Sequence, residues 1–154
     1  MAELIKVVAR FTDGTLLKGT TADFAVGKPV FHMNPAGGGP AVPVTCRSLK
    51  ALFFVKDFKG GPHASGLKGF TVPAGNASGK KIAVLFQDGE LLCGYTLAYV
   101  PGREGFFMFP ADGSSNNIRV FVVNAFVGEV RVGPEAEDLA NRVKSERSRA
   151  AMKV

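Results

Sequence analysis

The sequence predicts a mainly all-β protein that consists of two repeated, small, five-stranded units, each a barrel or a curled sheet, followed by one C-terminal α-helix. Three observations lead to this fold class. The 154-residue chain aligns with itself when it is shifted by 75 positions. Both copies contain short β-branched and aromatic runs between turn residues, a pattern typical of small barrels. Only the last segment has the period of an amphipathic helix.

The internal repeat is supported by residues of different kinds. Turn aspartates, glycines and apolar residues recur together at one spacing, which chance does not produce. The identical pairs include Asp13/Asp88, Gly14/Gly89, Leu16/Leu91, Leu17/Leu92, Gly19/Gly94, Thr21/Thr96, Gly27/Gly102, Phe31/Phe106, Met33/Met108, Pro35/Pro110, Ala36/Ala111 and Gly38/Gly113. We therefore assign residues 1–58 to a first β-barrel repeat, 59–80 to a basic Gly/Pro-rich linker, 81–133 to a second β-barrel repeat, and 134–154 to a C-terminal helix and basic tail.

Each repeat opens with a predicted β-hairpin. Asp13-Gly14 and Asp88-Gly89 each separate two apolar runs. Glycine tolerates the positive φ of a tight turn, so this dipeptide is a strong local hairpin signal. The aspartates are favoured there for hydrogen bonds to their own backbone, and we do not interpret them as a catalytic pair.

The second strand of each repeat is expected to be long and bent. It runs to Phe24 in the first copy and to about Tyr99 in the second, with Gly19 and Gly94 at matching interior positions. A glycine inside a strand favours a bulge or a sharp bend. Such a bend turns the corner of a small barrel.

Three further strands complete each predicted unit. In the first copy they are a third strand, Val30–Met33, and, after a loop at 36–43, two closing strands, Val44–Cys46 and Leu49–Phe58. In the second copy they are Gly105–Phe109 and, after a loop at 112–117, Ile118–Val123 and Phe126–Val132. Closure would remove the exposed edges of so short a sheet. Units of about 50 residues are marginally stable alone, so we expect the copies to pack together through one apolar face each.

The C-terminal segment predicts a helix that packs on a barrel. Pro134 occupies the first helical position, and acidic residues follow in the first turn. An apolar stripe has helical spacing and comprises Ala136, Leu139, Ala140 and Val143. Beyond Ser145 little can be buried, so we expect a frayed, solvated end. This end is either a soluble tail or a basic arm that contacts nucleic acid or anionic lipid.

Composition indicates a soluble globular protein. The chain is 46% hydrophobic with 13 Phe, and no apolar run reaches 18 residues. Met1-Ala2-Glu3 is not a charged leader, so we expect a cytoplasmic protein without a membrane span. The net charge of +6 is distributed unevenly: +3 over 1–58, +4 over 59–81, −2 over 82–134 and +1 over 135–154. The basic character therefore belongs mostly to the linker and the first repeat.

No residue pattern predicts catalysis, a metal or a cofactor. Cys46, Cys93, His32 and His63 lack the short spacings of zinc sites, and we expect both cysteines to be buried free thiols. Neither histidine lies near a Gly-x-Ser-x-Gly nucleophile motif. Gly37-Gly38-Gly39 is not followed by the Lys-Ser/Thr of a phosphate loop. We therefore interpret the protein as non-enzymatic.

Two segments of the second repeat resemble a known family. Val84–Tyr95, together with Arg119–Phe126, is similar to the strand order of the Sm and Hfq family of SH3-like small barrels, in which a hairpin precedes a bent second strand and a late β-pair has a tight turn. The resemblance covers both copies. It implies RNA binding by a loop such as His32-Met33-Asn34. The second copy has Phe107-Met108-Phe109 there, and the late turns, Asn124-Ala125 and Ser48-Leu49, lack the family's basic residue before glycine.

Two function classes remain. The first is a protein-interaction or scaffold module, with a protein partner or self-association through exposed strands and the linker. The alternative is a nucleic-acid or cyclic-dinucleotide binder that uses the basic first repeat and linker. For the cyclic dinucleotide, Asn76–Gly79 resembles the start of the nucleotide loop of PilZ receptors. The sequence also resembles uncharacterised bacterial proteins with the same Phe-x-Asp-Gly hairpin. The candidate ligand- or partner-binding residues are Arg10, Lys18, His32, Asn34, Lys68, Lys80, Lys81, Phe107 and Phe109.

Overall fold

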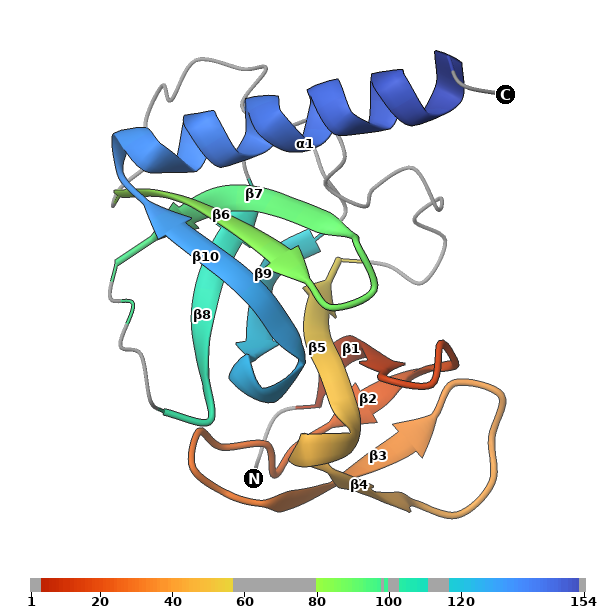
Figure 1. Cartoon of the computed structure of the whole chain (residues 1–154). Coiled ribbons are helices and arrows are strands. Elements are labelled where there is room, and N and C mark those ends of the chain that lie inside the picture. The colour runs from red at the N-terminus through yellow and green to blue at the C-terminus, as the bar shows by residue number, and fades with distance from the viewer. Residues whose placement is uncertain (1–3, 57–79, 98, 100–102, 111–116, 153–154) are drawn as a thin grey trace.

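The protein folds as one ten-stranded antiparallel sheet and one C-terminal helix (Figure 1). The computed structural model describes residues 4–56, 80–97, 99, 103–110 and 117–152. The strands are β1 (Ile5–Phe11), β2 (Leu16–Thr21), β3 (Val30–Pro35), β4 (Val42–Thr45), β5 (Leu49–Val55), β6 (Lys80–Phe86), β7 (Leu91–Thr96), β8 (Gly105–Pro110), β9 (Asn117–Val123) and β10 (Val127–Val132), and the helix is α1 (Pro134–Met152). The predicted fold class, mainly β with one C-terminal helix, is confirmed.

The strand order is β10-β6-β7-β8-β9-β5-β1-β2-β3-β4. The order has two ends, β10 and β4, so the sheet is not closed. The strands of each half of the chain are contiguous in it. The two halves are joined by pairing of β5 with β9, in which Leu52 lies opposite Phe121. We had expected contact through apolar side chains; this contact is present in both cores, and the halves share a backbone ladder in addition.

The two hairpin turns form as the sequence predicts. The carboxylate of Asp13 accepts a hydrogen bond from the Thr15 backbone N–H (2.9 Å), and that of Asp88 accepts one from the Glu90 N–H (3.0 Å). The glycine that follows each aspartate has a φ of +91°, a conformation that other residues rarely adopt. The side chain of the aspartate and the backbone of the glycine therefore fix each turn.

The second strands end earlier than predicted. β2 ends at Thr21 rather than Phe24, and β7 ends at Thr96 rather than Tyr99. The physical reason is the same at both ends: the Thr21 hydroxyl donates to the carbonyl of His32 (2.8 Å), and the Thr96 hydroxyl donates to that of Phe107 (3.1 Å). A side chain thus takes the place of the next backbone hydrogen bond, and the chain leaves the sheet.

Gly19 and Gly94 lie where two strands approach each other closely. A Cβ at Gly19 would lie 2.3 Å from the carbonyl oxygen of Asn34, and one at Gly94 would lie 2.0 Å from that of Phe109. No side chain fits at these distances. The glycines therefore allow β2 to lie close to β3, and β7 to lie close to β8, while the pairing of β2 with β1 and of β7 with β6 continues through them without a bulge.

Strand β5 is the centre of the molecule because both of its faces are buried. All seven of its residues are buried, including Lys50. Alternate side chains of a strand point to opposite faces. Leu52 and Phe54 pack in one core with residues of β1 and β3, whereas Phe53 and Val55 pack in a second core with residues of β6 and β7. Strand β9 alternates in the same way, so each core contains residues from both halves of the chain.

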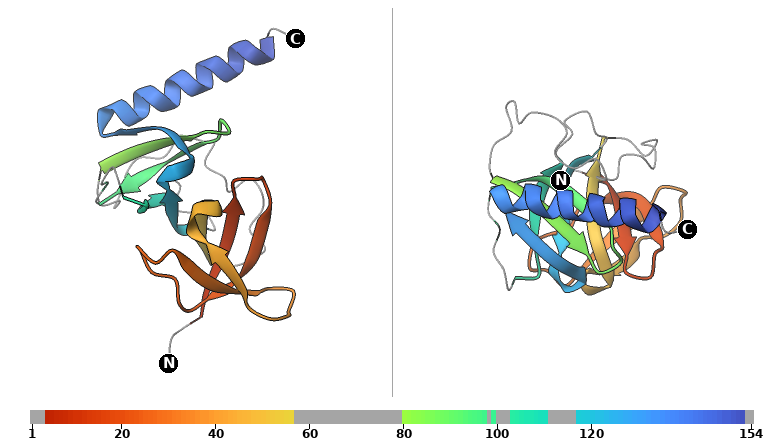
Figure 2. Two further views of the ribbon diagram at one scale, coloured as in Figure 1. Left: turned by 60° about the horizontal axis from the view of Figure 1, so that its bottom comes forward. Right: turned by 45° about the horizontal axis from the view of Figure 1, so that its top comes forward.

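The helix packs on β6, β7 and β10 through the predicted stripe. Ala136, Leu139, Ala140 and Val143 are buried against Ala83, Leu91 and Cys93. Figure 2 shows α1 and the strands β1 to β4 at opposite ends of the molecule. Among the described residues, no helix is apolar and long enough to cross a membrane.

The helix continues to Met152, so the frayed end that we expected beyond Ser145 is wrong for the backbone. The reason is that residues 146–152 contain neither glycine nor proline and include the good helix formers Glu, Arg, Ala and Met. The predicted linker is different: all but its last residue, Lys80, lies outside the described residues, so the proposed role of Lys68 is not addressed.

Candidate functional site

A pocket of about 340 Å³ lies where the two halves of the chain meet. Its wall combines aromatic rings, aliphatic side chains and two arginines. The lining residues are Val26, Leu97, Arg103, Gly105, Phe106, Phe107, Phe109, Arg119 and Phe121. Val26 comes from the segment between β2 and β3, and the others come from the second half. The pocket has the size and the mixed lining of a small-molecule site.

Arg119 lies between two aromatic rings in the pocket wall. It projects from β9, opposite Phe54 of β5. The centre of its guanidinium is 4.5 Å from the centroid of the Phe54 ring and 4.5 Å from that of Phe107. Both distances are within the range of cation–π attraction, which fixes the planar group against the rings. The two rings therefore fix the orientation of the Arg119 guanidinium.

The aromatic wall is held from the side of the first half by Phe24. Its ring packs edge-on against Phe31, Phe54 and Phe121, with centroids 5.1, 5.8 and 5.2 Å away. Edge-to-face pairs of this kind stabilise a fixed arrangement of rings. The segment that follows β2 is thereby anchored, which places Val26 at the rim of the pocket.

A second polar cluster lies at the joint between the halves. Lys50 of β5 is buried and forms ion pairs with Asp88 (2.7 Å) and Glu90, which belong to the hairpin turn between β6 and β7. Its Nζ also lies 4.8 Å from the centroid of the Phe86 ring. Partial burial alone would raise the pKa of Asp88, but hydrogen bonds from Lys50 and from the Glu90 N–H hold this pKa below its ordinary value.

Arg10, a predicted ligand residue, belongs to this joint. Its guanidinium lies 3.4 Å from Glu90 and 5.1 Å from the centroid of the Phe53 ring. The charge of Arg10 is thus directed at the second half of the chain. Arg10, Lys50 and Glu90 form a network that fastens the first half to the second.

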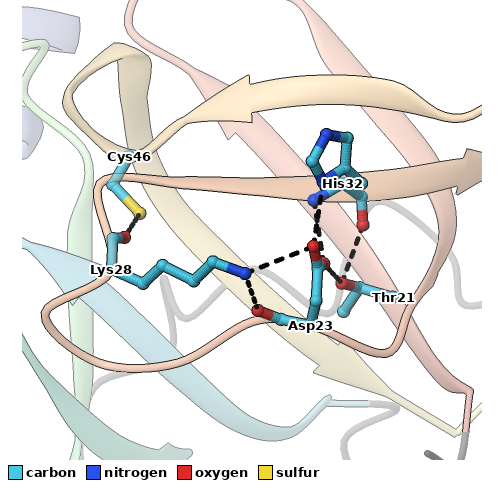
Figure 3. A network of polar contacts seen from close by, with 5 residues as sticks. All are labelled: Thr21, Asp23, Lys28, His32 and Cys46. Atoms are coloured by element: carbon cyan, nitrogen blue, oxygen red, sulfur yellow. Dashed lines mark hydrogen bonds and ion pairs between the residues drawn. The ribbon is translucent and has the colours of Figure 1, made fainter.

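His32, another predicted ligand residue, lies in a network of polar contacts with Asp23 (Figure 3). The Asp23 carboxylate accepts a hydrogen bond from the His32 backbone N–H (2.9 Å) and contacts the ring Nδ1 (2.9 Å). Lys28 lies 3.4 Å from the same carboxylate. The bonds from the backbone and ring of His32, followed by the charge of Lys28, hold the pKa of Asp23 far below its ordinary value.

This network organises the segment between β2 and β3. The thiol of Cys46 donates to the carbonyl of Lys28 (3.3 Å), on the side of the network away from the histidine ring (Figure 3). Burial, followed by the charge of Glu104, raises the pKa of Cys46. Among the described residues, the His32 ring has its polar contact with the Asp23 carboxylate, which holds the ring beside the start of β3.

The remaining candidates are dispersed over the surface. Asn34 is exposed on β3, Lys18 is exposed on β2, and Lys80 is exposed at the start of β6. Lys81 forms an ion pair with Glu137 of the helix. Of the predicted site residues that the structure describes, only Phe107 and Phe109 are brought together at the pocket.

Both cysteines are buried free thiols, as predicted. Cys46 belongs to the short 3-10 turn before β5, and Cys93 lies in β7 beneath the helix. Burial raises the pKa of Cys93 to about 12, which keeps its thiol protonated and weakly reactive.

Comparison with known sequences places these strands in one family. A family of unknown function (DUF6982) matches residues 4–133. The chain belongs to this family. No curated protein and no solved structure matches the chain. In this DUF6982 member, the matched residues include every strand of the sheet and stop before α1.

The sequence reasoning missed the two arginines of the DUF6982 pocket, Arg103 and Arg119. A signal for Arg119 was present: it is the one charged residue in the apolar run Ile118–Val123. An arginine inside a strand that is otherwise apolar indicates a special environment for its guanidinium. No local signal distinguishes Arg103, which lies in the segment before β8.

Proposed function

We propose that the protein is a non-enzymatic interaction module built from two equivalent five-stranded units, which associates with a second copy of itself through its unpaired strand edges. The observation that carries this proposal is the strand order. The first unit ends in β4 and β5, and the second ends in β9 and β10. β5 pairs with β9 inside the chain, whereas β4 and β10, the corresponding strands, occupy the two ends of the sheet, where neither has a second strand partner among the described residues.

The equivalence of the units is supported by their pairing registers. Val7 lies opposite Phe54, and Ile82, 75 positions after Val7, lies opposite Val132, which is 78 positions after Phe54. The last two strands of the units therefore correspond at an offset of 78 positions. In the same way, Val30 lies opposite Thr45, and Gly105 lies opposite Val123. The hairpin, the bent second strand and the late strand pair of each unit also support the proposed likeness to Sm-type barrels.

The internal joint defines how the free edges would meet. β5 and β9 form an antiparallel ladder in which Phe53 lies opposite Val120. Transferred to the equivalent strands, this register places Arg131 of one copy opposite Val42 of another. Val42 is 38% exposed, as expected for a residue at an unpaired edge. An unpaired edge presents backbone donors and acceptors that another strand can satisfy.

The proposal is tested by sedimentation equilibrium of the full chain. We expect concentration-dependent association that is weakened in Val42→Lys, because the new ammonium would lie opposite Arg131, and retained in Val42→Glu. Leu16→Lys is the control, because Leu16 is 53% exposed, more than Val42, but lies on β2, which has β1 and β3 as neighbours. A protein that stays monomeric up to about 100 µM, a range that covers weak association, would contradict self-association.

A further inference from the structure

The pocket wall holds two arginine charges that no described acidic residue neutralises. The aromatic rings of Phe54 and Phe107 hold Arg119, and neither Arg119 nor Arg103 forms an ion pair within the described part of the chain. The contrast with other cations is clear, since Arg10, Lys50 and Arg142 each have a carboxylate partner. A guanidinium with an unused fork of donors is suited to a phosphate or a carboxylate.

The same pocket exposes an unusual amount of apolar surface. Leu97 is 68% exposed, Val26 is 52% exposed and Phe109 is 37% exposed, and all three line the pocket. Single exposed apolar residues are ordinary, but a group of them around one hollow indicates a binding surface. Because Phe106 and Phe107 continue this surface inward, the apolar part of the wall is largely aromatic.

We infer that the pocket binds a planar aromatic ring that carries an anionic group, and that a nucleoside monophosphate has this chemistry. The base would lie against the ring of Phe109 and the side chain of Leu97, where stacking does not require a particular base. The phosphate would be held by Arg119 and Arg103. Most of the residues that line this site come from the second half of the chain, not from the basic first half, and the site is independent of the edges of β4 and β10.

The first test is calorimetric titration of the full chain with AMP, GMP, CMP and UMP, and with a single-stranded oligonucleotide of mixed sequence. Binding of mononucleotides identifies a free nucleotide as the ligand, and binding of the oligonucleotide alone identifies a nucleotide within a strand; both support the inference. Adenosine and inorganic phosphate are the partial ligands, and each should bind at least tenfold more weakly than AMP, because each lacks one half of the contacts. Equal affinity for inorganic phosphate and AMP would overturn the inference.

The second test uses two exposed residues, so that loss of binding does not reflect misfolding. Arg103→Ala removes a charged contact and should weaken binding by about tenfold or more. Phe109→Ala removes the stacking surface and should weaken it about fivefold to a hundredfold. Arg142→Ala is the control for charge, because Arg142 lies on the helix and faces Glu129 (2.6 Å). Affinity that is unchanged in Arg103→Ala and Phe109→Ala, or undetectable binding of every nucleotide ligand, would overturn the site.

Discussion

Substitution of Lys50 by methionine tests whether the ion pairs at the joint hold the two halves together. Methionine keeps most of the apolar stem of the lysine and removes the charge. In the native protein the ammonium contacts Asp88 and Glu90 and lies over the ring of Phe86. Its loss leaves both carboxylates without their main cation.

The magnitude follows from the exposure of these groups. Removal of one member of a fully buried pair costs about 3–5 kcal/mol of the free energy of unfolding. The side chain of Lys50 is 7% exposed, but that of Asp88 is 43% exposed and can regain water. We therefore expect Lys50→Met to cost about 2–3 kcal/mol, below the fully buried range. Adding Glu90→Gln should recover part of this cost, because the more buried carboxylate is then neutral.

Urea denaturation followed by circular dichroism measures these differences, since the chain contains no tryptophan for fluorescence. Lys56→Met is the matched control: Lys56 is exposed just beyond β5, and its loss should change stability by less than about 0.5 kcal/mol. If Lys50→Met were no more destabilising than Lys56→Met, the ion pairs of Lys50 would not stabilise the joint.

Four further predictions concern the rest of the fold. Gly19→Ala and Gly94→Ala should each lower the free energy of unfolding by about 3 kcal/mol or more, because the new methyl group collides with a backbone oxygen. Gly37→Ala, with open space around it, should be nearly neutral. Urea denaturation measures all three, and equal effects would contradict the close approach of the strands. Cys46 and Cys93 should react with a thiol reagent at pH 8 only after denaturation, because burial raises both pKa values, and rapid reaction of the native protein would refute this. The pKa values of Asp88, Asp23 and Glu129 are lowered in the folded protein, so their contribution to stability is present above their unfolded pKa values and is lost as pH falls below about 4. The melting temperature should therefore drop from pH 5 to pH 3, and less steeply in Asp23→Asn. A melting temperature that does not change over this range would refute the lowered pKa values. Residues 1–58 and 81–154, expressed separately, should each fail to unfold cooperatively, since each core needs both halves, and a sharp transition in either alone would show that the cores are independent.

The local features of the fold were predictable, because a few neighbouring residues determine them. The Asp-Gly turns need only a side-chain acceptor and a glycine, and the apolar stripe of the helix needs only residues four apart. The ladder between β5 and β9 was not predictable in this way. The apolar run of β5 indicates burial on both faces, but it does not identify the strand that pairs with it.

The site was only partly predictable for the same reason, because the sequence does not show which distant residues contact each other. Arg10 and His32 were predicted as ligand residues because charge and aromatic nitrogen are visible in a sequence, whereas their carboxylate partners are not. Glu90 lies far along the chain from Arg10, and Asp23 reaches His32 only because β2 ends at Thr21. Phe107 and Phe109 were predicted because they alternate along one strand, and both line the pocket, Phe107 partly buried and Phe109 exposed.

On the proposed alignment of the units, the pocket cannot occur twice. The positions that correspond to Phe109 and Arg119 are Asn34 and Ala41, which supply neither a stacking surface nor a charge. Arg119 also requires β5, because Phe54 provides one of the two rings beside its guanidinium. Formation of the joint therefore completes a site that neither unit contains alone. The net charge of the sequence favours a ligand at the first unit, whereas the proposed ligand would lie at the joint, against arginines and exposed rings that come mostly from the second unit.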